Sequence, residues 1–242
     1  MRTITFAFVV WFVFLTGYAL ADQQFPPEET LAPVERVFVP SGFDDNDVSE
    51  VVVQGVFPNS CYRTWRNGYT IDESSRTITV WVTAYMHKSL LCAQVMTPYI
   101  VPVKLGILKV GSYEVKALGL SGESPSLKIK ERTVESPDDF LYAPVEGANV
   151  ESDENGRQYL QIFGRFPLLK RGCLKIEEVV QEDVENDVLV VLPVMKELYG
   201  DACNDATDAF NLKVGLKAHL EGDKLLHVRS INGNSYNRFI QN

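Results

Sequence analysis

The sequence predicts an all-β protein made of two tandem immunoglobulin-like β-sandwich domains, each with one internal disulfide bond. Three observations support this prediction: a set of short motifs occurs twice, the four cysteines fall at matching positions in the two copies, and apolar residues alternate with a period of two. No segment shows a sustained helical period with capping residues. We therefore expect about seven short strands in each copy, with a small closed barrel as the alternative architecture.

The repeat consists of four anchors whose offsets lie between 109 and 112 residues. Ala-Pro-Val-Glu occurs at 32–35 and again at 143–146, and Gly-x-Phe-Pro occurs at 55–58 and at 164–167. The cysteines follow in the same order. A period this long has the size of a whole domain rather than of a solenoid repeat, so the pattern indicates a duplicated domain. A linker is expected at residues 135–139, where charged residues, Ser and Pro cluster, which gives domains at 22–137 and 138–242.

Four cysteines allow three disulfide pairings. If each copy closes its own pair, Cys61 bonds to Cys92 and Cys173 bonds to Cys203, with sequence separations of 31 and 30 that agree as duplication requires. A loop of this length contributes roughly 3 to 4 kcal/mol to stability in the chain-entropy model. A zinc site is the competing interpretation. It is disfavoured, because the sequence has no C-x-x-C pair and only His87 lies near a cysteine.

The strand pattern is clearest around the Gly-x-Phe-Pro motif. Val51, Val53 and Phe57 share one face of a predicted strand. Their counterparts at offset 109 do the same: Leu160, Ile162 and Phe166. In the next predicted strand, residues 77–83, the inward residues are Ile78, Val80 and Val82.

The matching segment of the second copy, residues 187–192, is apolar on both faces. We therefore expect its outer face to be covered as well, by the neighbouring domain or by a partner. The first copy should close with two strands and a Gly-containing turn within 101–115 and a last strand that starts at 127–130. The second should close with 210–220, a turn at Gly222, and 224–230.

Residues 1–21 have the pattern of a signal peptide. Arg2 gives a short positive start, the segment 4–15 is almost unbroken apolar sequence, and Ala-Leu-Ala at 19–21 is a small-x-small cleavage site. No cysteine follows that could carry a lipid anchor, and no later stretch is long and apolar enough to cross a bilayer. We expect a periplasmic or extracellular protein without membrane insertion after signal removal. Its net charge of −9 disfavours nucleic acid as a partner.

The first copy resembles a recurrent, largely uncharacterised immunoglobulin-like domain of exported bacterial proteins. The resemblance rests on Gly-Val-Phe-Pro-Asn-Ser-Cys at 55–61, on Cys92, and on a V-x-L-x-x-L-x-x-G-x-Y-x-V pattern at 103–115. The second copy departs from it, because five residues separate Phe-Pro from Cys173 and no Tyr follows Gly222 at the corresponding spacing. The resemblance implies a fold and a compartment. It carries no catalytic residues.

Nothing in the sequence indicates an enzyme or a cofactor. Only His87, His219 and His227 could act as a base near neutral pH, and none lies in a recognised nucleophile or metal motif. His219 and His227 flank the Gly222 turn, and we expect a surface pair rather than a metal site because no third ligand accompanies them. Two acidic loops, 44–47 and 153–156, are expected to be solvated hairpin tips, with a weak calcium site as the alternative.

The aromatic residues of the first copy are the best candidates for an interface. Trp81 and Tyr85 alternate with the inward residues, so both rings fall on the outer face. Residues just beyond the first cysteine could extend that surface: Tyr62, Trp65, Arg66 and Tyr69. The alternative is that Trp65 packs over the disulfide and that Trp81 is covered by a loop or by the second domain.

These observations favour a non-enzymatic binding or structural module of the bacterial periplasm or cell surface. Its partner would be an envelope or extracellular protein, or a glycan. The alternative is an inhibitor of secreted proteases, whose reactive loop would lie at residues 86–89. An enzyme would need a site centred on a histidine and assembled across the two domains.

Overall fold

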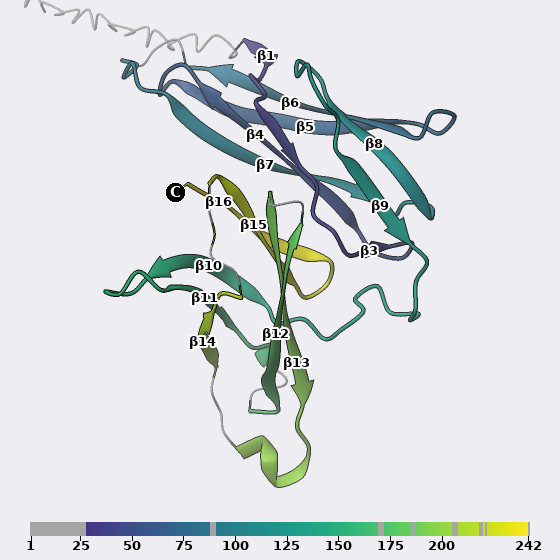
Figure 1. Ribbon diagram of the computed structural model, residues 1–242, viewed down its shortest axis with the longest axis vertical. Helices are drawn as coiled ribbons and strands as arrows, with labels where there is room; N and C mark the ends of the chain where they lie inside the picture. The colour runs from purple at the N-terminus through teal and green to yellow at the C-terminus, as the bar shows by residue number, and fades with distance from the viewer. Residues whose placement is uncertain are drawn as a thin grey trace, which may run out of the picture.

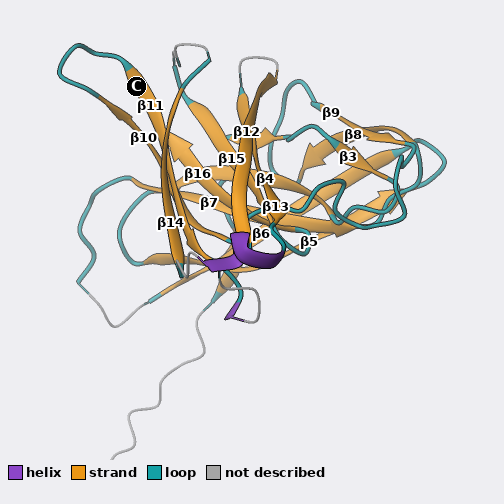
Figure 2. Cartoon of the chain, turned by 90° about the horizontal axis from the view of Figure 1, so that it is seen from below, coloured by secondary structure: helices purple, strands orange, loops and turns teal. Residues whose placement is uncertain are grey.

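The computed structural model describes residues 28–87, 91–168, 172–184, 187–204, 208–217, 220 and 222–241. The predicted signal peptide lies outside these residues. The chain forms two β-sandwiches in succession, and apart from the 3-10 turn η2 (Gly200–Asn204) the described structure is strands and loops (Figures 1 and 2). The all-β fold class is therefore confirmed. Among the described residues, no helix has the length and apolar character needed to span a membrane.

The first sandwich has a smaller and a larger sheet (Figure 1). The smaller sheet pairs in the order β2-β4-β7, from β2 (Arg36–Phe38), β4 (Ser49–Phe57) and β7 (Thr97–Gly106). The larger sheet has the order β1-β6-β8-β9-β3, and a further strand, β5, lies along the other side of β6. Its strands are β1 (Glu29–Leu31), β3 (Phe43–Asp44), β5 (Tyr62–Asp72), β6 (Thr77–Met86), β8 (Gly111–Ala117) and β9 (Ser126–Lys130).

The second sandwich repeats this arrangement. Its smaller sheet is β10-β11-β14 and its larger sheet is β12-β13-β15-β16. Both larger sheets contain a parallel pair at the same place, β6 with β8 in the first and β13 with β15 in the second. The strands are β10 (Val145–Ser152), β11 (Gln158–Arg165), β12 (Leu174–Val184), β13 (Val188–Glu197), β14 (Ala209–Gly215), β15 (Lys224–Ser230) and β16 (Asn234–Ile240).

The predicted inward residues lie in the two cores. Val51, Val53, Ile78, Val80 and Val82 have no exposed surface in the first sandwich. The corresponding core of the second sandwich contains Leu160, Ile162 and Phe166. The disulfide pairing is also confirmed, since Cys61 bonds to Cys92 and Cys173 to Cys203, one bond within each sandwich. Two such bonds fit an oxidising compartment.

The two recurring motifs contact each other in space. A Cβ atom added to Gly55 would lie 1.9 Å from the carbonyl oxygen of Pro33, and one added to Gly164 would lie 2.0 Å from that of Pro144. The proline belongs to Ala-Pro-Val-Glu and the glycine to Gly-x-Phe-Pro. Only glycine allows this approach, so the motifs recur together because they form one contact in each domain.

The two sandwiches pack face to face. A shared apolar cluster joins Phe38 and Val52, on the smaller sheet of domain 1, to Val188, Val190 and Leu225, on the larger sheet of domain 2. The molecule is thus a stack of four sheets, with an apolar core inside each sandwich and a third apolar layer between them. The prediction that the outer face of 187–192 is covered is confirmed, and domain 1 is what covers it.

The connection that contains the predicted linker runs over the surface between the sandwiches, and its residues 134 and 138 contact domain 1 and domain 2 respectively. Asn46 of domain 1 donates a hydrogen bond to the carbonyl oxygen of Val134. In domain 2, the backbone N–H groups of Asn232 and Gly233 donate to the two carboxylate oxygens of Asp138. The connection is therefore tied to both domains at its two ends.

Candidate functional site

The predicted aromatic surface lies on β5 and β6, at the end of domain 1 away from domain 2 (Figure 1). The sequence did not reveal β5 as a strand, because its residues do not alternate between apolar and polar. β5 pairs antiparallel with β6 and contains a bulge between Thr64 and Asn67. Since cross-strand partners share a face, the register fixes which of its side chains point away from the core.

The structure brings together two of the five predicted aromatic interface residues. Trp65, in the bulge, is 53% exposed and meets the edge of Tyr85 at a ring distance of 5.3 Å. Trp81 is half-buried on the same face, because its ring lies on the bare backbone of Gly68, the residue opposite it on β5. Trp65 therefore packs on Tyr85, and the Trp81 ring packs on β5.

The other two predicted interface residues lie on the core side of the sheet. Tyr62 stacks on Phe57 at a ring distance of 5.6 Å and packs against the core of domain 1. Tyr69 lies opposite the buried Val80, although 38% of it is exposed at the sheet edge. Tyr62 and Tyr69 thus do not extend the outer surface, since the alternation of the strand turns them away from it.

Three basic side chains complete the outer surface. Arg66 was part of the predicted surface, and Arg63 and His87 were not. The Arg66 guanidinium lies 5.9 Å from the Trp65 ring, and Arg63 is the cross-strand partner of Tyr85. The His87 ring lies 4.9 Å from the Tyr85 ring, and the backbone N–H of His87 donates to the carbonyl oxygen of Cys61. The arginines flank Trp65 in the sequence, which was the available signal. We call Arg63, Trp65, Arg66, Tyr85 and His87 the aromatic-basic patch.

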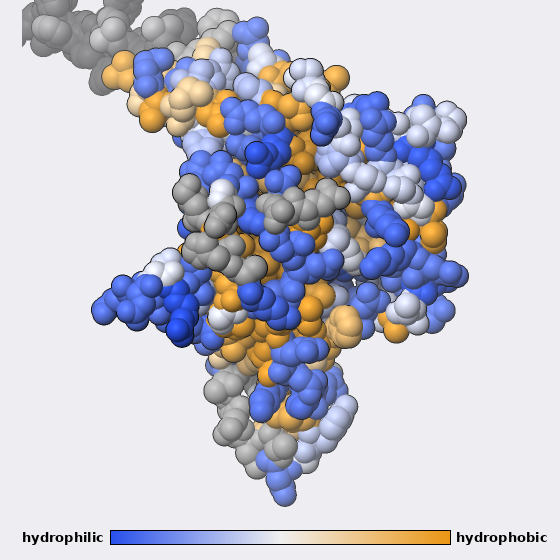
Figure 3. Space-filling view, viewed as in Figure 1, coloured by the Kyte–Doolittle hydropathy of each residue, from blue (hydrophilic) through white to orange (hydrophobic). Residues whose placement is uncertain are grey.

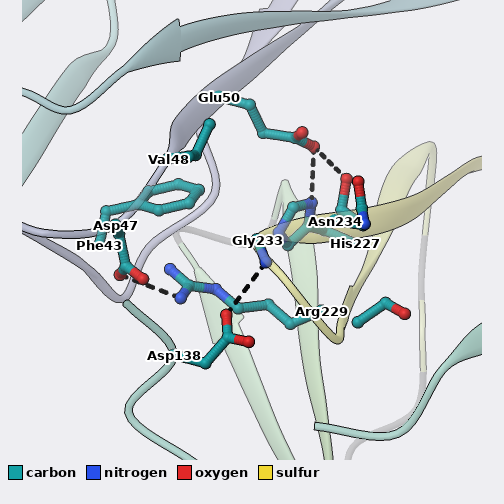
Figure 4. Close-up of a pocket in the computed structure, with 11 residues that line it drawn as sticks. Phe43, Asp47, Val48, Glu50, Asp138, His227, Arg229, Gly233 and Asn234 are labelled. Atoms are coloured by element: carbon teal, nitrogen blue, oxygen red, sulfur yellow. Dashed lines mark hydrogen bonds and ion pairs between the residues drawn. The ribbon is translucent and has the colours of Figure 1, made fainter. Parts of the chain in front are cut away.

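A second group of functional side chains lies between the domains (Figure 4). Arg229 of β15 reaches into domain 1, where it donates to Asp47 at 3.1 Å and to the carbonyl oxygen of Gly42 at 2.7 Å. Its guanidinium also lies 4.3 Å from the Phe43 ring. Both charged side chains of the pair are buried, at 7% and 4% exposed. This is a desolvated ion pair across a domain boundary.

His227 of β15 and Glu50 of β4 form a neighbouring pair between the two domains. His227 Nδ1 lies 3.5 Å from a Glu50 oxygen and 2.8 Å from Asn237 Oδ1. The same Glu50 oxygen accepts hydrogen bonds from Ser235 and Asn237. Burial lowers the pKa of His227, against the attraction of Glu50. The prediction of a surface histidine pair is wrong for His227, which is 1% exposed; His219 lies outside the described residues.

The two acidic loops have different environments. Residues 153–156 form the exposed tip of the β10–β11 hairpin, which projects from the body as a hydrophilic arm (Figures 1 and 3). Asp44 and Asp47, by contrast, are buried in the domain interface at 5% and 3% exposed. The prediction of a solvated tip is therefore wrong for 44–47, because domain 2 covers that loop.

Carboxylate oxygens of Asp44, Asp47 and Asp139 lie within 4.8 Å of one another. Burial raises the pKa of Asp47 and of Asp139, and the Arg229 charge opposes the rise in both. Asp44 accepts a hydrogen bond from the backbone of Asn46, and Asp47 accepts one from Asp44. The adjoining cavity, lined by residues that include Asp47 and Arg229, measures only ≈ 10 Å³, at the lower limit for one water molecule. The geometry suits a joint between domains rather than a substrate site.

The fold and these two sites define a disulfide-bonded protein of two stacked β-sandwiches with an exposed ring cluster at one end. Residues 51–125, from β4 to the segment before β9, match the family model described as the ORF11 beta-sandwich domain. The match lies within domain 1 and covers about a third of the chain. Comparisons with curated proteins and with solved structures gave no match. The possible inhibitory turn at 86–89 includes Lys88 and Ser89, which lie outside the described residues.

Proposed function

We propose that this chain is an exported, non-enzymatic binding module of a bacterial periplasm or cell surface. Domain 1 contacts a protein or glycan partner through the aromatic-basic patch, and domain 2 holds domain 1 in a fixed orientation. Gene duplication of one sandwich domain accounts for the two halves. Export is supported by the signal-peptide pattern at 1–21 and by the two disulfides, which persist outside the cytoplasm.

The observation that carries this proposal is the exposed Trp65 ring. A tryptophan that is 53% exposed and held edge-on by Tyr85 is costly to leave in water, and arginine beside aromatic rings is the composition of binding hot spots. The same surface suits a sugar ring, which stacks on exposed aromatic faces.

The test compares two variants of the mature protein for binding to the envelope fraction of its own host and to a glycan array. The Trp65→Ala/Tyr85→Ala variant should bind at least about tenfold more weakly, since hot-spot residues contribute more than about 1.4 kcal/mol. Tyr199→Ala is the matched control, because Tyr199 is 77% exposed on domain 2. Circular dichroism should show the same fold for all three proteins. Wild-type binding by the double variant contradicts the proposal.

A further inference from the structure

Strand β5 is an open sheet edge. In the described part of the chain its only strand partner is β6, and eight of its eleven residues are exposed. An edge strand presents one row of backbone N–H and C=O groups to solvent, which is a template for another strand. Natural proteins usually protect such an edge with charged side chains, proline or an inward-pointing charge.

The equivalent strand of domain 2 has this protection. β12 carries Asp183 in the inward phase, opposite the core residue Leu189, where it is bound to the buried Lys224 at 2.9 Å. Its outward edge is acidic, with Glu178 and Glu182 exposed. Charges of this kind on an edge strand oppose pairing with a further strand.

β5 has no inward-pointing charge, although it carries two exposed arginines and a bulge. Ile71, opposite the core residue Ile78, occupies the place that Asp183 has in β12. β5 contains no lysine and no proline, and its bulge displays Trp65 beside Arg66. The same fold therefore contains one edge strand with an inward-pointing charge and one without it, and the strand without it borders the aromatic-basic patch.

The charge of β5 identifies the kind of chain that would pair with it. Arg63 and Arg66 are exposed on a protein whose net charge is −9. The Arg66 side chain is 65% exposed, and its guanidinium lies 3.9 Å from a carboxylate oxygen of Glu29. Asp72, at the far end of the strand, is its only acidic residue. A partner strand with acidic side chains near Arg63 and Arg66 would be attracted, and a basic one would be repelled.

We propose that an extended, acidic segment of a partner protein adds to β5 as a further antiparallel or parallel strand. This inference rests on the proposed function and names the partner of the same surface. The backbone of β5 supplies the pairing hydrogen bonds, Arg63 and Arg66 select acidic side chains, and Trp65 offers an apolar contact to one residue of the added strand.

The first experiment selects binders from a phage library of random nine-residue peptides on the mature, oxidised protein. Enriched peptides should be acidic. They should bind at least about tenfold more weakly to Arg63→Glu/Arg66→Glu. The control variant Arg157→Glu/Lys175→Glu has the same net charge and changes two exposed residues of domain 2, and it should bind them as the wild type does.

The second experiment places N-methyl groups on an enriched peptide. Because alternate N–H groups of a strand point to opposite sides, methylation of one alternate set should abolish binding and methylation of the other should leave it intact. Equal binding by both methylated peptides would overturn strand addition and leave the aromatic-basic patch in place. Enrichment of basic or uncharged peptides, or of none, would overturn the acidic partner. If Trp65→Ala/Tyr85→Ala also keeps envelope binding, the proposed function fails as well.

Discussion

At the scale of single residues, the most informative side chains are the buried charges between the domains. Asp47 and Arg229 each lose nearly all contact with water, and they form an ion pair with each other across the domain boundary. A buried ion pair contributes little net stability compared with an apolar pair, but removal of one member leaves the other desolvated and unpaired. We therefore expect the ion pair to determine the relative orientation of the two domains and to contribute little to the net free energy of their association.

Arg229→Met should lower the free energy of unfolding by about 3–5 kcal/mol at pH 7, because it leaves the Asp47 carboxylate buried without a cation. Urea unfolding followed by tryptophan fluorescence measures this loss. Asp47→Asn/Arg229→Met should recover a large part of it, since the uncompensated charge is then gone. If Arg229→Met were as stable as the wild type, the prediction would be wrong, because water would then solvate the Asp47 carboxylate.

His227 should make the molecule less stable in mild acid. Burial lowers the pKa of His227, so the unfolded chain takes up a proton as the pH falls below about 6.5 while the folded chain resists it. The free energy of unfolding contributed at this position is therefore present above that pH and is lost as the pH falls. Urea titrations of the wild type and His227→Gln between pH 7.5 and 5 should diverge, with the wild type losing more. Parallel curves would contradict this prediction.

Residue patterns predicted part of the candidate site. Trp81 and Tyr85 were predicted on the outer face because they alternate with Ile78, Val80 and Val82, and the register agrees. His227 could not be recognised in the same way. Its burial depends on Glu50, which lies 177 residues earlier in the chain and in another domain, and no local pattern reports such a contact.

At the scale of elements, the close approach of a glycine to a proline carbonyl explains why two motifs recur. Gly55 sits on β4 where the segment before β2 crosses it, and Tyr99 of β7 donates its hydroxyl to the same Pro33 oxygen at 2.6 Å. Burial raises the pKa of Tyr99 to about 12, which keeps the hydroxyl protonated as a donor. Domain 2 has Phe210 at that position, so it keeps the close approach without the hydroxyl bond.

Gly55→Ala should destabilise domain 1 by about 1–3 kcal/mol, the usual cost of overpacking, because its Cβ would overlap a backbone oxygen that a rotamer change cannot move. Gly215→Ala serves as the control, since a Cβ there meets nothing within 4 Å. Thermal unfolding of the two variants measures the difference. Equal melting temperatures would contradict the assigned role of Gly55.

Elements with regular alternation were predictable, and β5 and β12 were not. β4, β6, β8 and β9 match predicted segments because one face of each lies in a core. β5 and β12 have few core residues, so no regular apolar period marks them in the sequence. Their existence follows from the hairpins that they form with β6 and β13, which is a tertiary property.

At the scale of the whole molecule, the stack ends after two sandwiches because polar residues occupy the docking positions on both outermost faces. Register places Gln161 of β11 at the position that Val52 has in β4, and Asn211 at the position of Ile100. On the larger sheet of domain 2, the residues that contact domain 1 are Val188, Val190 and Leu225. The equivalent positions on the larger sheet of domain 1 are polar: Thr77, Thr79 and Glu114. The sequence alone indicated this asymmetry, through the doubly apolar segment 187–192.

Val52→Glu should separate the domains without unfolding domain 1, because Val52 points out of the core of domain 1 into the layer between the sandwiches. We expect the single calorimetric transition of the wild type to split into two, and the radius of gyration from X-ray scattering to increase. Gln161→Glu, the equivalent change on the outermost face of domain 2, should alter neither. One unchanged transition for Val52→Glu would show that the apolar layer does not couple the domains.

Because the interface between the domains is buried, neither domain has its full set of contacts when it is separated from the other. A fragment that ends before the linker would expose Phe38 and Val52 and would leave Asp47 and Glu50 without their partners from β15. A fragment that starts after it would expose the valines of β13. Although each half has its own core and its own covalent cross-link, the smallest portion of this chain that can be moved intact into another protein is the pair.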